Sequence, residues 1–396
     1  MEFPPVSVTP MAAPDLTTML AQLIATPSIS SVSPQFDQGN RAVIDQLAEW
    51  LAAAGFRVEI LPLAHRPDKA NLIARLGAET GDCASGLILA GHTDTVPFDE
   101  GRWRHDPFRW TIDGDRAYGL GTADMKSFLA LAIEAARGLR PADLTAPLWI
   151  VATADEESSM DGARLLAELQ RPKARFCVIG EPTGLAPVAL HKGVMMEAVT
   201  VIGRSGHSSD PANGVNALDG MQRVLTAITD WRESLKTITQ PRFAVPYPTL
   251  NFGHICGGDN PNRICPSCTL HFDLRPLPGM RGSELRAALR ERVAEALADT
   301  GCSFELRTLS AGIEPFDAGP DSVLAGYLAE ISGQQPRSVA YGTEAPFYQA
   351  LGCDTVVFGP GSIDQAHQPD EFIRLDALHD TVRMLRQLIQ RCCLAG

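Results

Sequence analysis

Four short apolar runs along the chain each end abruptly in polar residues. They are "LILAGHTD" from Leu87, "LWIVATADEE" from Leu148, "FCVIGEP" from Phe176 and "TVVFGPGS" from Thr355. Continuous apolar runs of this length are typical of strands that are buried on both faces. Helical patterns such as "DMKSFLALAIEAARGL" lie between them. This alternation of strand and helix predicts an α/β domain with a mostly parallel sheet.

Residues from about 190 to 309 show a different pattern. A strand candidate "MMEAVTVI" is followed by a helical pattern, and two further strand candidates, "TLNFGHI" and "CTLHFDLR", come next. A helix from Ser283, ended by Gly301, and a last strand "SFELRTL" complete the series. The order β-α-β-β-α-β is typical of a ferredoxin-like module. We therefore predict that residues 190–309 form an inserted α+β domain between two parts of the first domain, residues 1–189 and 310–396.

Composition and charge narrow the function classes. A chain of 396 residues exceeds the size at which one core usually stops growing, which agrees with two domains. The net charge of −13 argues against partners that present phosphate, namely nucleic acids and anionic membranes. No apolar run is long enough to span a bilayer, and the N-terminus lacks the features of a signal peptide. We therefore expect a cytoplasmic protein.

The nine cysteines are too sparse for a disulfide scaffold, and their odd number favours reduced thiols. Cys265 and Cys268 form a CxxC pair. A single pair without a second pair or nearby histidines is weak support for a zinc site, so we expect a structural or incidental role for these two residues.

The polar residues at the strand ends are the candidate chemistry. The carboxyl ends of parallel strands meet at one edge of a sheet, and here they would bring together His92, Asp94, Asp155, Glu156, Glu157 and Glu181. His367 follows the fourth run, and Asp124 could either cap a helix or join the same edge. Each residue alone could be an ordinary polar loop residue. Together, these carboxylates would repel one another without a cation, and a mixed histidine and carboxylate set suits zinc, cobalt or manganese, including two neighbouring ions.

Six segments of the chain resemble the M20 family of dinuclear zinc peptidases and deacylases. In chain order they are "GHTDTVP", "YGLGTADMK", "ATADEESS", "GEPT", "GRSGHSSDP" and "AHQPDE". The resemblance implies that His92, Asp124 and Glu181 hold one zinc ion. It implies a second zinc ion held by Glu157, His367 and a bridging Asp124, with cobalt as a plausible substitute.

The same resemblance implies the catalytic roles. Asp94 would fix the tautomer of the His92 imidazole. Glu156 would be the general base, which takes a proton from the water between the metals and returns it to the leaving amine. Adjacent residues of an extended chain point in opposite directions, which agrees with separate roles for Glu156 and Glu157. Asp155 has no assigned role.

The resemblance also implies that the inserted domain forms the dimer interface and a lid over the site. His207 would stabilise the developing oxyanion, supplied across a homodimer by the partner subunit. Arg263 is a candidate for binding a substrate carboxylate, because guanidinium groups bind carboxylates in a bidentate manner. The full set of candidate substrate contacts is Asn262, Arg263, Arg275, Thr343 and Glu344.

A second set of segments is similar to the deacylases of this family that act on N-acyl amino acids such as N²-acetyl-L-ornithine. They are "GHTDTVPFDEGRW", "NRIC", "HFDLRPLPGM", "YGTEAPF" and "GPGSIDQAHQPDEF". Two departures are Gly342, where relatives often have cysteine, and an N-terminal extension of about ten residues. The expected function is hydrolysis of an N-acyl amino acid, with a small-molecule substrate.

Several alternatives stay open. The substrate could be another acyl amino acid, such as succinyl-diaminopimelate, or the enzyme could be a dipeptidase or a carboxypeptidase. A metal-bound dimer that binds ligands without catalysis and a redox protein that uses Cys265 and Cys268 belong to different classes. The presence of both Glu156 and His207 favours an enzyme.

Overall fold

The computed structural model describes residues 13–78 and 84–394, so the N-terminal extension lies outside the described residues. The chain folds into two compact units. The first contains the described residues up to Ala189, together with Ala318–Pro336 and the residues from Phe347 onward; the second contains Leu190–Asp317 and Arg337–Pro346. The second unit extends past the expected end at residue 309, because Val194 and Ile313 exchange backbone hydrogen bonds of 2.8 and 2.9 Å.

A large mixed sheet has most of its strands, including all the central ones, in the first unit. Its strand order is β1 (Arg57–Leu63), β2 (Arg66–Leu76), β6 (Leu148–Thr153), β3 (Leu87–His92), β7 (Phe176–Ile179), β15 (Asp354–Val357), β8 (Val188–His191) and β13 (Phe316–Asp317), with β14 (Arg337–Val339) on β8. The central strands β6, β3, β7 and β15 are parallel, and they are the four predicted apolar runs. This confirms the prediction of a mixed α/β fold with a mostly parallel central sheet.

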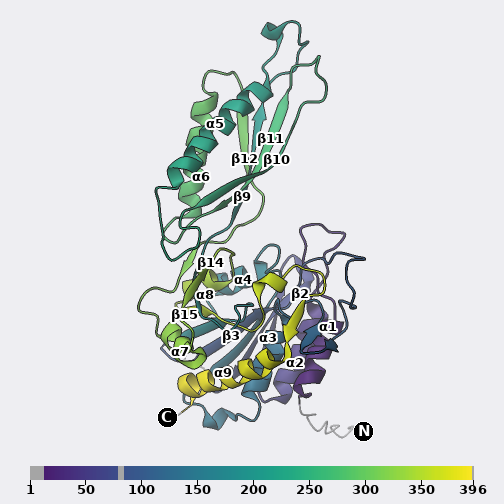
Figure 1. Cartoon of the computed structure of the whole chain (residues 1–396), viewed down its shortest axis with the longest axis vertical. Helices are drawn as coiled ribbons and strands as arrows, with labels where there is room; N and C mark the ends of the chain where they lie inside the picture. Colours follow the sequence, from purple (N-terminus) through teal and green to yellow (C-terminus); the bar gives the residue numbers. More distant parts are fainter. Residues whose placement is uncertain (1–12, 79–83, 395–396) are drawn as a thin grey trace, which may run out of the picture. The chain divides into compact units, whose positions relative to one another are not determined.

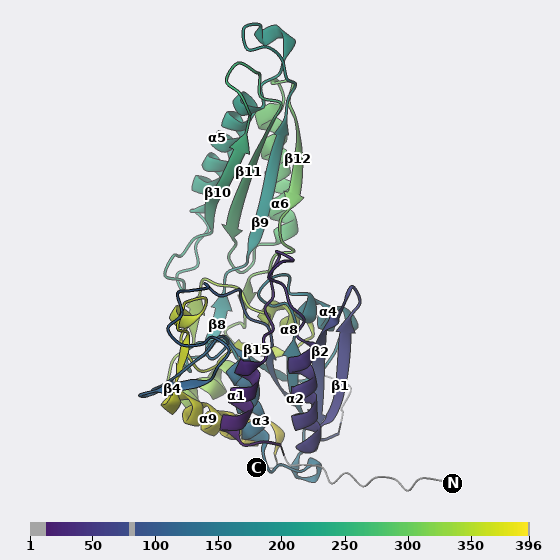
Figure 2. The ribbon, with the colours of Figure 1, turned by 90° about the vertical axis from the view of Figure 1, so that its right-hand side faces the viewer.

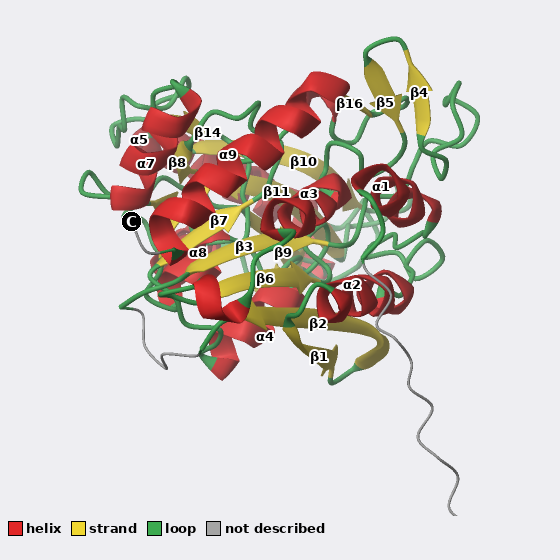
Figure 3. Cartoon of the chain, turned by 90° about the horizontal axis from the view of Figure 1, so that it is seen from below, coloured by secondary structure: helices red, strands yellow, loops and turns green. Residues whose placement is uncertain are grey.

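Helices cover this sheet because its central strands are apolar on both faces. All six residues of β3 and of β6 are buried. Leu87 and Leu89 share one core with Phe128 and Leu385, and burying each such side chain contributes about 1.5–3 kcal/mol. Figure 3 shows α9 and α3 lying across the central strands, whereas α2 packs against β1 and β2. The helices of this part are α1 (Leu16–Ala25), α2 (Arg41–Ala53), α3 (Lys126–Ala136), α4 (Asp161–Leu169), α7 (Val323–Ser332), α8 (Ala345–Ala350) and α9 (Leu375–Cys393).

A small sheet ties two distant segments of the first unit together. It consists of β4 (Thr111–Asp113), β5 (Arg116–Tyr118) and β16 (Phe372–Arg374), with β5 in the middle. Phe372 pairs with Tyr118 in the β16–β5 ladder. The loop that follows β5 is thereby held beside the loop that precedes β16.

The second unit is a four-stranded antiparallel sheet with two long helices on one face (Figures 1 and 2). Leu270, Phe272 and Leu274 alternate inward along one strand, as predicted, and pack in a core with residues of both helices. The elements are β9 (Met195–Ile202), α5 (Ala217–Leu235), β10 (Thr249–Gly257), β11 (Ser267–Arg275), α6 (Gly282–Leu297) and β12 (Ser303–Thr308). Their β-α-β-β-α-β succession and the sheet order β10-β11-β9-β12 are those of a ferredoxin-like module.

None of the helices in the described part of the chain combines the length and the apolar composition that crossing a lipid bilayer requires. The cysteines of the described ranges carry free thiols. Cys265 and Cys268 are both buried, and Cys265 donates a hydrogen bond to the carbonyl of Ser267 at 3.1 Å.

Close packing between α3 and β7 leads to a stability prediction. A Cβ atom at Gly180 would lie 2.0 Å from the ring of Phe128, which is itself buried. We expect Gly180→Ala to lower the free energy of unfolding by about 1–3 kcal/mol, because the ring must move within a packed core. Gly326→Ala is the matched control in α7, where a Cβ meets nothing within 4 Å, and it should raise stability by about 0.5–1 kcal/mol. Denaturant unfolding measures both; equal effects would contradict the packing described.

Candidate active site

The first cluster of polar side chains forms at the carboxyl ends of β3 and β7. Potential ligand atoms of His92, Asp124 and Glu181 all lie within 4.8 Å of one another, and all three residues are buried. The Nε2 atom of His92 is 3.2 Å from Oδ1 of Asp124 and 3.9 Å from Oε1 of Glu181. Helix α3 begins at Lys126, and its N-cap position makes no side-chain hydrogen bond. Asp124 is therefore not the helix cap, and its carboxylate faces His92 instead.

The second cluster shares Asp124 with the first. Potential ligand atoms of Asp124, Glu157 and His367 lie within 4.8 Å of one another. The Nε2 atom of His367 is 3.1 Å from both carboxylate oxygens of Glu157 and 3.7 Å from Oδ2 of Asp124. One oxygen of Asp124 thus faces His92 and the other faces His367.

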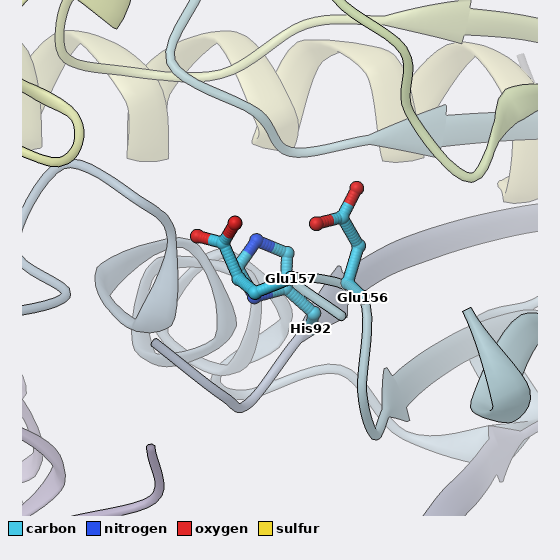
Figure 4. Close-up of side chains that lie close together, drawn as sticks. All are labelled: His92, Glu156 and Glu157. Carbon is cyan, nitrogen blue, oxygen red and sulfur yellow. The ribbon is translucent and has the colours of Figure 1, made fainter. Parts of the chain in front are cut away.

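Glu156 and Glu157 both lie near His92. The three residues form a third group within 4.8 Å, and Figure 4 shows the two carboxylates on either side of the His92 ring. The expectation that these glutamates belong to an extended segment is wrong. Strand β6 ends at Thr153, and the amides of Ser158, Ser159 and Met160 donate to the carbonyl of Asp155, so the chain turns here.

Asp155, unassigned from the sequence, fixes this turn. It is buried, and its backbone φ is 60°, a left-handed conformation. Its carboxylate pairs with the ammonium of the buried Lys69 and accepts a hydrogen bond of 2.7 Å from Ser30. Lys69 also pairs with Asp37 at 2.7 Å. The ion pair neutralises the charge beside the two glutamates and holds the start of their turn. Lys69 was not predicted from the sequence. The only local feature that could have indicated it is the position of a lysine directly before the apolar residues of β2.

Asp94 makes a different contact from the one expected. The Nδ1 atom of His92 lies 3.0 Å from the backbone carbonyl of Asp94, so the carbonyl, rather than the carboxylate, accepts the ring proton. The nearer carboxylate oxygen of Asp94 is 3.8 Å from that nitrogen. The other oxygen accepts the backbone N–H of Glu157 at 3.0 Å. Burial raises the pKa of Asp94 to about 6. Asp94 thus orients two residues. Its backbone carbonyl holds the ring of His92, and its carboxylate holds the backbone N–H of Glu157.

The electrostatics of the two clusters favour positive charge. Burial alone would lower the pKa of His92, but the carboxylates of Asp124 and Glu181 outweigh it and raise that pKa well above its usual value. The hydrogen bond to Glu157 raises the pKa of His367 to about 9. Burial opposes ionisation of Asp124, yet its hydrogen bond with His92 keeps its pKa low.

The donor sets suit divalent cations. Each of the first two clusters offers imidazole nitrogen and carboxylate oxygen, the ligands that zinc, cobalt and manganese accept. Each also supplies three protein ligands, as catalytic zinc sites do. The only metal-candidate groups found among the described residues are these two clusters and the third group around His92. The Cys265 and Cys268 pair belongs to none of them.

Three of the residues predicted in the inserted domain lie together in the second unit. His207 and Arg263 pair through a backbone bridge, and the amide of Ser208 donates to the carbonyl of Asn262 at 3.0 Å. His207 is exposed, and its Nδ1 accepts a hydrogen bond of 3.2 Å from the backbone N–H of Ser209, with the Ser209 hydroxyl 2.7 Å from the same nitrogen. The other ring nitrogen is therefore the one left to donate a proton.

The remaining predicted contacts lie elsewhere in the second unit. Arg275 is paired with Asp273 at 2.8 Å on β11. Thr343 and Glu344 are both fully buried. At Gly342 a Cβ would lie 2.9 Å from the side chain of Ile313, so the absence of a side chain there matches local packing.

Comparison with known proteins places this geometry in a family. Residues 88–391 match the model of peptidase family M20/M25/M40. The chain is 48% identical over 383 residues to an acetylornithine deacetylase from Proteus mirabilis, covering 96% of this chain and 98% of that protein. It is 46% identical over 385 residues to an acetylornithine deacetylase from Yersinia pseudotuberculosis, covering 97% and 99%.

Among solved structures, a tripeptidase from Staphylococcus aureus shares the fold with a TM-score of 0.72 at 19% identity, covering 95% of this chain and 97% of that one. The family match spans both clusters and all the residues that form them. This chain therefore belongs to peptidase family M20/M25/M40.

Proposed function

We propose that this protein is a metal-dependent amidohydrolase that converts N²-acetyl-L-ornithine and water into L-ornithine and acetate, a step of arginine biosynthesis. The observation that carries the proposal is that the carboxylate of Asp124 lies between His92 of one cluster and His367 of the other, with Glu156 close to His92. Its substrate is taken from the relatives named acetylornithine deacetylase, which match nearly the whole chain at 46–48% identity.

The two clusters would hold two zinc ions, for which cobalt could substitute. His92, Asp124 and Glu181 would bind one ion, and Asp124, Glu157 and His367 the other. Ions bound in this way polarise an amide carbonyl and lower the pKa of a water molecule.

The protein's own side chains then move the proton. Glu156 is placed near His92 and Glu157 but lies outside the cluster with Asp124 and His367, so its carboxylate serves as the general base. It accepts a proton from the attacking water and delivers it to the amine nitrogen as the amide bond breaks. Asp94 holds the backbone of Glu157 and the ring of His92 in place during these steps.

The second unit would supply dimerisation and a lid, inserted between the parts of the catalytic domain. His207 of the partner subunit would donate a hydrogen bond to the oxyanion; the exposure of this residue and its single available ring nitrogen support the role. The candidate substrate contacts are Asn262, Arg263, Arg275, Thr343 and Glu344. We further propose a cytoplasmic location, which agrees with free thiols on the described cysteines.

Metal affinity should depend on pH in a defined direction. In the ion-free protein His367 is protonated below its pKa of about 9, whereas a ligating imidazole must be neutral. Binding in the second cluster therefore releases a proton, and affinity should rise with pH by about tenfold per unit until pH 9. Calorimetric titration with Zn²⁺ in buffers of different ionisation enthalpy measures the release. An affinity that stays constant between pH 6 and 8 would refute the assignment of His367.

The two adjacent glutamates should separate catalysis from metal binding. Glu156→Gln should lower kcat by at least about 100-fold, because the proton acceptor is lost, while elemental analysis still finds two ions per subunit. Glu157→Gln, its matched neighbour, should lose metal from one site. Surviving turnover in the first variant would show that Glu156 is not the base, and unchanged stoichiometry in the second would reverse the two roles.

Substrate profiling tests the assignment itself. Side-by-side turnover of acetylornithine, acetylmethionine, succinyl-diaminopimelate and dipeptides by the metal-replete enzyme should favour acetylornithine. A clear preference for any of the other three would overturn the substrate but not the chemistry. Loss of activity on thiol blocking, without loss on chelation, would instead favour a redox protein.

A further inference from the structure

A buried carboxylate outside the candidate ligand set lies against the loop that carries Asp124. Glu371 is 1% exposed. Its Oε1 atom accepts the backbone N–H groups of Ala123 at 2.7 Å and Asp124 at 3.0 Å, and its Oε2 atom accepts that of Gly121 at 3.0 Å. Its own carbonyl accepts the N–H of Gly119 at 3.0 Å. One residue thus binds the loop between β5 and α3 at four points.

This loop depends on that carboxylate because its conformation is irregular. Gly119 and Gly121 both adopt positive φ, at 149° and 86°, and no side chain caps the helix that follows. The amides at 121, 123 and 124 precede the first helical turn. Without Glu371, three buried N–H groups would lose their acceptor, and an unsatisfied buried donor destabilises the conformation that leaves it unpaired.

The same residue is also close in sequence to His367. Only three residues separate them, and the segment is anchored at both sides. Asp370 accepts the backbone N–H groups of Arg104 at 2.9 Å and His105 at 3.0 Å, and Phe372 begins β16, which pairs with β5. The His367 segment and the Asp124 loop are therefore joined directly by Glu371.

We propose that Glu371 is a positioning residue for the metal centre. It sets the place of the Asp124 backbone, so that one carboxylate oxygen faces His92 while the other faces His367. Glu371 acts through the loop amides and touches no ion or substrate itself. The inference rests on the two-ion centre proposed above, and it predicts that metal affinity responds to a change in a residue that is no ligand.

The test replaces Glu371 by glutamine. The glutamine oxygen can still accept the N–H groups of Ala123 and Asp124, but its amide nitrogen then meets the N–H of Gly121, donor against donor. We expect the weaker of two Co²⁺ ions to bind about 10–100-fold less tightly, as for other residues that support metal ligands. The visible spectrum of the two-cobalt protein should also change, because the ligand geometry at Asp124 is altered. If Glu371→Gln does not fold, Glu371→Asp, which keeps the charge but shortens the reach, takes its place.

A matched control separates positioning from general destabilisation. Glu197 in the second unit is likewise buried, at 2% exposure, and accepts hydrogen bonds from Arg286 and Thr308. Glu197→Gln should lower the melting temperature but leave cobalt affinity and spectrum unchanged. If Glu371→Gln bound cobalt with the affinity of the wild-type protein, or if Glu197→Gln lost as much cobalt affinity, the inference about Glu371 would be overturned. The proposed two-ion centre would still stand. Failure of the wild-type protein to bind a second ion would remove the two-ion centre and this inference together.

Discussion

One carboxylate set between two imidazoles is the constraint on which the site depends. Asp124 directs one oxygen to His92 and the other to His367, so a displacement of its backbone alters both clusters at once. The two histidines come from segments 275 positions apart in the sequence. Their distance from each other is therefore set by the fold. A change in the fold that displaces the shared carboxylate would alter the geometry of both clusters.

The surroundings of Asp124 hold it by buried charge and backbone hydrogen bonds. Glu371 binds the loop of Asp124 through three amides, and Asp94 accepts the amide of Glu157. On the other side, Asp155 and Lys69 form a buried ion pair at the start of the glutamate turn. Buried pairs of this kind add little net stability. Their value here is that they fix backbone direction where several carboxylates must lie close together.

Much of the architecture of the first unit could be predicted from the sequence, because the patterns that identify its central strands are local. Continuous apolar runs identify β3, β6, β7 and β15, and parallel pairing then collects their polar ends. Asp124 was ambiguous because a helix cap and a strand-edge carboxylate look alike until the helix start is known. Lys69 and Asp155 lie 86 positions apart, and Glu371 acts on amides nearly 250 positions away. Periodicity in the sequence does not reveal contacts over such separations, so the roles of Lys69, Asp155 and Glu371 became clear only in the structure.

The turn at residues 155–160 shows a related limit. An extended chain would have pointed Glu156 and Glu157 in opposite directions, yet the left-handed Asp155 starts a turn that keeps both near His92. Of the two, Glu157 is the one whose carboxylate also reaches the imidazole of His367, which supports the separate roles that we propose for them. A crystal structure of the zinc-loaded protein, with anomalous data at the zinc edge, tests this arrangement most directly. Two peaks should flank the Asp124 carboxylate, one beside His92 and Glu181 and one beside Glu157 and His367. A single peak, or a peak bound by Glu156, would contradict it.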